Sequence, residues 1–279
     1  SSFQRPLVLG IIPSLRLKGY TDMNQAVNLD EMQLFRDMAR RAFEKEISPH
    51  YEQWEEEHMV PRELWNTLGA AGLLCPDVAE EYGGAGTTPH VTLAMIEELS
   101  YMCFGGFASA YGIHSNIIAP YLSRHGTPEQ KAHWLPRMVT GECVGALAMT
   151  EPGAGSDVQS IRTNAVRDGD EWVINGMKRW NSGLHHATHD IIFARTSGDP
   201  GSPVGISAFL VPTDLPGFNV DFFWWTFNMP TDHAEVSLKD VRVSSTALFG
   251  RLDHGLDLAQ HFVHENRIRQ AASSLGAAQ

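Results

Sequence analysis

Apolar residues recur at steps of three and four through the first half of the chain, which is the spacing of an amphipathic α-helix. The pattern predicts helices over residues 29–48, 62–73, 90–103, 108–124 and 128–138. The last of them has a strong start signal, with Thr127 as N-cap, Pro128 in the first turn and Gln130 at the third helical position. We therefore expect residues 29–143 to form an all-α domain, and residues 1–28 to form an extended arm or leader.

The pattern changes at Val144. Short apolar runs now alternate with turns rich in glycine, proline and aspartate, which is typical of short β-strands. These runs predict strands over residues 144–149, 165–166, 172–174, 190–196, 205–211 and 234–243. We expect residues 144–250 to form a compact, barrel-like β-domain. Helical spacing returns near Gly255, so residues 251–279 predict one further helix, and the fold class is α+β.

Composition and charge narrow the classes of function that the chain can have. Of the 279 residues 43% are hydrophobic and 19% charged, and the formal net charge is −12. These values are ordinary for a soluble enzyme, and the acidic balance argues against a nucleic-acid surface. No apolar run reaches the roughly 20 residues that a membrane span requires. The three cysteines, Cys75, Cys103 and Cys143, have neither zinc nor redox spacing, so we expect reduced thiols in an intracellular compartment.

Residues 149–157, which read MTEPGAGSD, directly follow the first predicted strand. A proline, two glycines and small residues in one turn bring backbone N–H groups to the surface with no side chain in the way. Such a turn suits a planar, oxygen-rich ligand such as a flavin ring or a pyrophosphate. A simple tight loop is the alternative, because two glycines alone are weak evidence.

A second phrase, NGMKRWNSG, occupies residues 175–183. Together the two phrases resemble, in order and separation, the two flavin-binding segments of the acyl-CoA dehydrogenase family. The resemblance extends from about residue 29 to the end of the chain. It implies an FAD-dependent α,β-dehydrogenation of an acyl-CoA thioester to the trans-2-enoyl-CoA. It also implies a C-terminal four-helix bundle, of which residues 251–279 supply only the first helix, so we expect the chain to be truncated.

The resemblance implies a cofactor site. The Thr150 hydroxyl would meet flavin N5 or O4, the Trp180 indole would cover the dimethylbenzene side, and Ser182 would supply a second hydroxyl. A turn-capping Thr150 and a core Trp180 are the alternatives. The complete set of expected FAD-binding residues is Leu147, Met149, Thr150, Gly155, Ser156, Trp180, Asn181 and Ser182.

For the substrate, Ser156 resembles the residue that touches the CoA or pantetheine portion, with an ST-turn as the equal alternative. Arg267 fits a helix arginine near the active site, with a surface salt bridge as the alternative, and His264 lies three residues before it. The catalytic base is unknown. In this family the usual glutamate lies in the bundle, beyond residue 279; a minority of members carry it immediately before the helix arginine, where this chain has Asn266. Glu265, one residue away, is the remaining candidate, against an exposed helix glutamate.

Two other clusters of residues carry possible chemistry. His185 and His189 have the spacing of metal ligands on one helix face, but the strand-like residues that follow leave little room for a helix, so we expect no metal. The aromatic residues 222–225 fit either an acyl or partner surface or, in preference, core or interface packing.

The resemblance further implies an acyl-CoA substrate, an electron-transfer flavoprotein as electron acceptor, and a homodimer or homotetramer. It implies a bacterial cytoplasmic location, with the mitochondrial matrix as the alternative. Two other functions remain open at this point. One is an acyl-CoA oxidase or flavin monooxygenase of the same fold, and the other is a non-catalytic, truncated flavin-binding partner.

Overall fold

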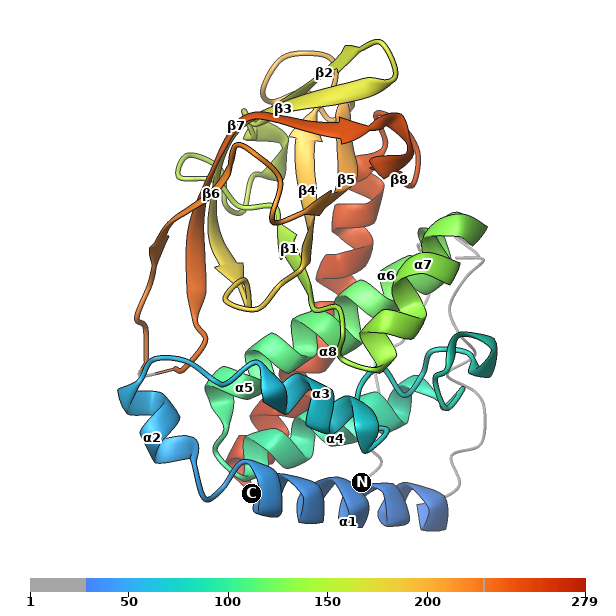
Figure 1. The fold of residues 1–279 in the computed structure, drawn as a ribbon, viewed down its shortest axis with the longest axis vertical. Helices are drawn as coiled ribbons and strands as arrows, with labels where there is room; N and C mark the ends of the chain where they lie inside the picture. Colours follow the sequence, from blue (N-terminus) through green and yellow to red (C-terminus); the bar gives the residue numbers. More distant parts are fainter. Residues whose placement is uncertain (1–28, 228) are drawn as a thin grey trace, which may run out of the picture.

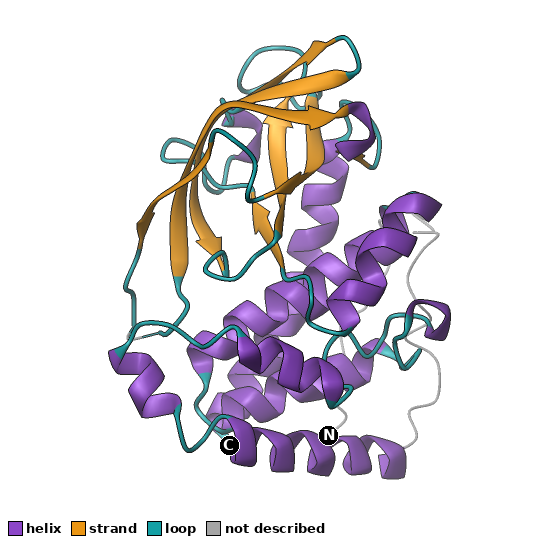
Figure 2. Cartoon of the chain, viewed as in Figure 1, coloured by secondary structure: helices purple, strands orange, loops and turns teal. Residues whose placement is uncertain are grey.

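The computed structural model describes residues 29–227 and 229–279, so the predicted arm over residues 1–28 lies outside the described residues. Helices gather at one end of the molecule and a twisted sheet at the other, with a long final helix running between them (Figures 1 and 2). The N-terminal helices are α1 (Leu29–Glu46), α2 (Tyr51–Glu56), α3 (Glu63–Ala70), α4 (Pro89–Tyr101), α5 (Gly105–Tyr111), α6 (Ala119–His125) and α7 (Pro128–Val139). The 3-10 turn η1 (Glu80–Tyr82) lies in the loop before α4.

Helices α5 and α6 are the two ends of one continuous helix, joined by the π-helical segment η2 (Gly112–Ile118). Segments of this kind are rare and often lie at functional sites. Gly112 opens the segment, and a Cβ there would lie only 2.6 Å from Nη1 of Arg269. The absence of a side chain at Gly112 therefore lets the guanidinium group of Arg269 lie close to the backbone of η2.

The β-region is a single sheet of eight strands. Its strands are β1 (Gly145–Ala148), β2 (Asn164–Asp168), β3 (Glu171–Ser182), β4 (His189–Arg195), β5 (Ile206–Pro212), β6 (Phe218–Phe223), β7 (His233–Ser244) and β8 (Leu248–Phe249). Two 3-10 turns, η3 (Val158–Ser160) and η4 (Ser245–Ala247), lie in its connections. The order is β6-β7-β3-β2-β4-β5-β8, with β1 parallel to β4.

The prediction of a barrel-like domain is wrong on closure, because the sheet stays open. Strands β6 and β8 end the order on opposite sides, and no pairing joins them among the described residues. The parallel contact between β2 and β4 is reduced to one pair, Asn164 with Arg195. The sheet therefore has two edges where a barrel would have none.

One hydrophobic core runs from the helical region into the sheet. It joins helix residues such as Phe43, Trp65 and Phe107 to the strand residues Ile191 and Phe249. Helix α8 (Gly255–Ala278) packs along α4 and reaches β5, as Figure 1 shows. The described residues contain this one helix of the C-terminal bundle that the resemblance implies. Shared packing fixes the helices against the sheet, and the candidate site lies at that junction.

The start of α7 has the predicted capping box. The Thr127 hydroxyl accepts from the Gln130 N–H at 3.2 Å, and the Gln130 side chain accepts from the Thr127 N–H at 3.1 Å. The Gln130 amide nitrogen also donates to the carbonyls of Thr246 and Leu248 in the sheet region. One side chain thus caps a helix and ties it to the sheet.

We predict that Gln130→Ala lowers the free energy of unfolding by about 2–3 kcal/mol, because a buried amide loses one capping bond and two sheet contacts. The neighbouring Glu129→Ala, at an exposed position of the same turn, should lower stability clearly less than Gln130→Ala does. Urea unfolding of both variants checks this. Equal losses would contradict a structural link through Gln130.

Candidate active site

A cavity of about 430 Å³ lies where the helices meet the sheet. Residues from α5, η2, the end of β1, β3, the start of β7 and α8 surround it. Five of the expected cofactor residues line it together: Leu147, Met149, Thr150, Trp180 and Ser182. The two sequence phrases therefore meet at one hollow, although about 30 residues separate them.

Trp180 reaches the cavity through an irregularity in β3. The register with β7 shifts between Lys178 and Asn181, so the strand carries a bulge at this point. Within the bulge Trp180 has a φ of +61°, a strained value for a non-glycine residue. The indole is 43% exposed and packs against Trp224 at 4.8 Å between ring centroids. A bulge next to a cavity commonly serves to redirect one side chain, and here it presents an indole face.

Lys178 joins the two phrases from behind. Its side chain is fully buried, and its Nζ donates to the Met149 carbonyl at 3.1 Å and to Glu151 Oε1 at 2.8 Å. A backbone bond adds to this link, from the Arg179 N–H to the Thr150 carbonyl at 2.9 Å. The turn after β1 is thereby fixed to β3 at the residues that flank Thr150.

Glu151 also holds the chain that leaves the turn. Its carboxylate accepts from the backbone N–H groups of Arg162 at 2.7 Å and Thr163 at 3.0 Å. Backbone bonds between Glu151 and Ala154 close the turn in both directions. Since a buried carboxylate needs partners, these bonds and Lys178 make Glu151 a structural anchor.

Helix α8 supplies the wall opposite the sheet. Phe262, Asn266, Arg269, Gln270 and Ser273 line the cavity at helical steps of three and four. Nε and Nη2 of Arg269 donate to Asn266 Oδ1 at 3.0 and 2.7 Å. Sequence reasoning did not assign this polar face to the site. The spacing of these residues was the available signal, and it was hidden among the apolar residues that pack the other faces of the helix.

Comparison with known proteins decides the family. The family model described as "Acyl-CoA dehydrogenase, N-terminal domain" matches residues 29–142, and the one described as "Acyl-CoA dehydrogenase, middle domain" matches residues 146–241. The chain belongs to the acyl-CoA dehydrogenase family.

Individual family members agree with this assignment. The mitochondrial long-chain specific acyl-CoA dehydrogenase of Sus scrofa is 36% identical over 252 residues, covering 89% of this chain and 58% of the relative. A crystal structure of an acyl-CoA dehydrogenase from Geobacillus kaustophilus has a TM-score of 0.84 at 35% identity, covering 91% of this chain and 67% of the other. The Mycobacterium smegmatis glutaryl-CoA dehydrogenase, described as a complex with FADH2, has a TM-score of 0.81 at 30% identity, covering 92% and 64%. The chain thus spans less than two thirds of the length of the pig relative.

The other expected site residues do not line the cavity. Gly155 and Ser156 are exposed beyond the turn, and His264 and Arg267 are exposed on α8. Asn181 is fully buried and donates to Asp190 Oδ2 at 2.5 Å. These five therefore stay predictions that rest on the family resemblance.

Glu265, the remaining candidate for the base, forms an ion pair with Arg124. It does not line this cavity. It faces a separate, smaller pocket between α4, α6 and α8. No carboxylate lines the 430 Å³ cavity among residues 29–227 and 229–279. The described part of the chain thus forms this cavity without an acidic side chain in its lining.

The remaining clusters have local partners. His185 stacks on Phe223 at 3.9 Å, and His186 Nε2 lies 2.5 Å from the Val60 carbonyl. Within the described ranges no group of three or more His, Cys, Asp or Glu residues is placed to hold a metal ion, and no helix is long and apolar enough to cross a membrane. Residues 222–225 are at least partly exposed, and Trp224 packs against Trp180, so core packing is not supported for them, while interface packing and an acyl or partner surface stay predictions.

The Glu151 pKa lies below its ordinary value of 4.5. Burial acts to raise it, but the Lys178 charge and the hydrogen bonds from Arg162, Lys178 and Thr163 outweigh burial. A carboxyl group whose pKa falls on folding stabilises the fold above its unfolded value, and this contribution is lost as acid protonates the folded group. The anchor therefore operates at neutral pH and weakens below about pH 4.5.

We predict that Lys178→Met lowers the free energy of unfolding by about 3–5 kcal/mol, because it leaves the buried Glu151 charge without its partner. The double variant Lys178→Met/Glu151→Gln should recover part of that loss. Lys239→Met, at an exposed position on β7, is the matched control and should change stability by less than about 0.5 kcal/mol. Denaturant unfolding measures all three. A Lys178→Met protein as stable as the control would refute the anchor.

A second prediction concerns Asp190, which is fully buried next to Asn181. Burial raises its pKa from 3.8 to about 7, against the opposing effects of Asn181 and Lys178. The folded state therefore binds more protons than the unfolded state between these values, so stability falls as pH rises from about 4 to 7. Asp190→Asn should abolish this fall and be more stable than the wild type above pH 7. Unfolding curves across this pH range decide the point, and parallel pH profiles for both proteins would contradict it.

Proposed function

We propose that the chain binds FAD with the isoalloxazine ring in the cavity between Thr150 and Trp180. The observation that carries this proposal is the meeting of both flavin-type phrases at one hollow of about 430 Å³. The donor chemistry fits the group. Hydroxyls of Thr150 and Ser182 suit the polar edge of the ring, and the half-exposed Trp180 indole suits its apolar face. The family relative described with FADH2 supports the same choice.

We further propose that the intact protein carries out α,β-dehydrogenation of an acyl-CoA thioester. Bound flavin supplies a hydride acceptor, which no amino-acid side chain can provide. The chain's own residues position that group and limit water. Ser182 Oγ lies 2.7 Å from His233 Nδ1, and this hydrogen bond holds the side chain in place; the tautomer of His233 decides which atom donates. Ile113, Leu147, Met149 and Phe262 give the cavity apolar walls that favour an acyl chain over water.

Asn266 contributes a hydrogen-bond donor rather than a base. Arg269 can only donate, so the Asn266 atom that it contacts is the amide oxygen, and the NH2 group is directed elsewhere. An amide does not take up a proton at neutral pH. We propose that Asn266 binds a substrate or cofactor oxygen, and that a carboxylate from outside the described residues removes the α-proton. Electron-transfer flavoprotein as the acceptor and a homo-oligomeric assembly belong to the same proposal.

The test is titration of the purified chain with FAD, followed by flavin fluorescence. Thr150→Val should weaken binding about fivefold to tenfold by removing one hydrogen bond, and Trp180→Ala by tenfold or more. Thr140, the exposed C-cap of α7, does not line the cavity, so Thr140→Val is the matched control and should leave Kd unchanged. Acyl-CoA-dependent dye reduction by the loaded, intact protein tests the reaction. A chain that binds no FAD, or whose Kd is the same in all variants, would overturn the proposal.

A further inference from the structure

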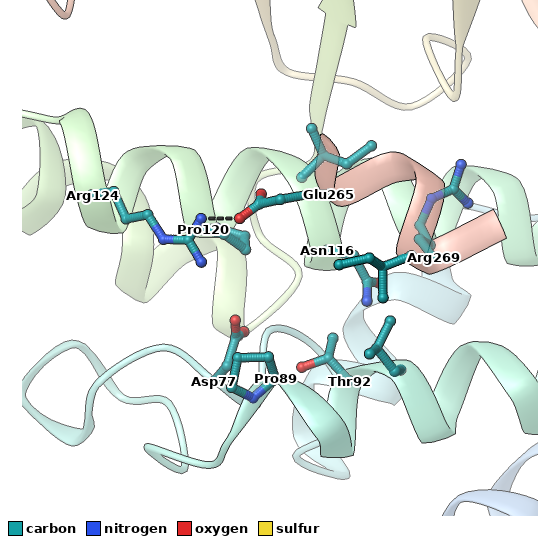
Figure 3. Close-up of a pocket in the computed structure, with 11 residues that line it drawn as sticks. Asp77, Pro89, Thr92, Asn116, Pro120, Arg124, Glu265 and Arg269 are labelled. Carbon is teal, nitrogen blue, oxygen red and sulfur yellow. Dashed lines mark hydrogen bonds and ion pairs between the residues drawn. The ribbon is translucent and has the colours of Figure 1, made fainter. Parts of the chain in front are cut away.

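A second, smaller pocket adjoins the cavity on the far side of Arg269. It has a volume of about 70 Å³ and lies between α4, the η2–α6 helix and α8. Figure 3 shows Asp77 and Thr92 on one side of it, and Arg124, Glu265 and Asn116 facing them. Arg269 lines both the pocket and the cavity, and only 7% of its surface is exposed. Its side chain is the wall that the two compartments share.

Buried hydrogen-bonding atoms without partners converge on this small pocket. They are Oγ1 of Thr92, Oδ1 of Asn116, Oδ1 of Asp77 and Oε2 of Glu265. Thr92 itself is only 2% exposed. Each such atom costs on the order of 1–3 kcal/mol if it stays unpaired. Four of them around one half-open pocket indicate a site for a group that donates hydrogen bonds.

Apart from Arg124 and Arg269, the rest of the lining is hydrocarbon. Pro89, Leu93, Ile117, Pro120 and Ile268 supply it. A space of 70 Å³ holds about four or five water-sized groups. The shape and chemistry therefore match a few methylene groups that end in one polar donor.

Charge restricts that donor to a neutral group. The carboxylates of Asp77 and Glu265 disfavour a second carboxylate, and the guanidinium groups of Arg124 and Arg269 disfavour an ammonium ion. A hydroxyl carries no charge and can donate to Asn116 or Asp77 while it accepts from Thr92. An aliphatic chain without a donor would leave all four atoms unpaired, whereas one hydroxyl pairs with one acceptor oxygen and with the Thr92 hydroxyl.

We propose that this pocket is the distal end of the acyl site, and that it receives the hydroxyl-bearing end of an ω-hydroxyacyl chain. The inference rests on the proposed function, since it places the thioester end of the same substrate in the larger cavity. Helix α8 leads from one compartment to the other, with Asn266 and Gln270 facing the cavity and Glu265 and Ile268 facing the pocket. For one chain to occupy both spaces the Arg269 side chain must move aside, which would make Arg269 a specificity-determining residue.

The experiment measures Kd by calorimetry for matched pairs of acyl-CoA thioesters, with and without an ω-hydroxyl, from butanoyl to hexadecanoyl, on the FAD-loaded protein. At the chain length that reaches the pocket, the hydroxylated thioester should bind about tenfold more tightly than its unsubstituted partner, and shorter pairs should show no difference. Thr92→Val and, separately, Asn116→Leu should each remove most of this preference. Both substitutions nearly conserve side-chain volume, and melting temperatures confirm that each variant is folded.

Thr87→Val is the matched control. The Thr87 hydroxyl is also buried without a partner, but it does not line the pocket, so this variant should keep the full preference. Equal Kd values within every pair, or a preference that survives in Thr92→Val and Asn116→Leu, would overturn the inference while unsubstituted thioesters still bind and reduce the dye. If no thioester of either kind binds or is oxidised, the proposed function itself fails and the inference fails with it.

Discussion

A single buried ammonium group organises the site. Lys178 lies inside the sheet with no exposed surface, yet it contacts the Met149 carbonyl and the Glu151 carboxylate of a turn that is far away in the sequence. Burying a charge is costly unless it is paired, so the Lys178 ammonium group is stable in its buried position only when the turn and β3 are correctly packed together. The same contact places Thr150 on one side of the cavity and leads β3 into the bulge that presents Trp180. Cofactor geometry and local stability are therefore coupled.

The helical half of the fold could be predicted from local signals. The periodic apolar spacing and the Thr127–Gln130 capping box are properties of short segments, and the helices lie close to their expected bounds. The sheet was harder. Residues 172–174 were predicted as a short strand, whereas β3 spans Glu171–Ser182, because buried polar residues such as Lys178 and Asn181 break the apolar alternation. Strand β6 was missed for a related reason, since most of its residues are exposed. Whether a sheet closes depends on its edges, and no local pattern carries that information.

The site divides in the same way. Thr150, Trp180 and Ser182 could be proposed because family phrases mark them, and they line one cavity. The Asn266–Arg269 wall could not, because its role depends on which face of α8 meets the sheet rather than on any motif. Asn181 lies within a family phrase but is turned inward by the bulge toward Asp190. Motifs thus identified the residues at the turn and the bulge, while tertiary packing determined the opposite wall and the polar pocket behind Arg269.

The most direct test of the central claim is a crystal structure of the chain with FAD. Because the Lys178–Glu151 contact fixes the turn against β3, we expect the flavin ring in the cavity between them. The Thr150 hydroxyl should lie at its polar edge and the Trp180 indole against its apolar end. We also expect the Lys178 contacts to Met149 and Glu151 to remain unchanged on binding. Density for the ring at another place, or a Trp180 side chain packed into the protein interior away from it, would contradict the claim.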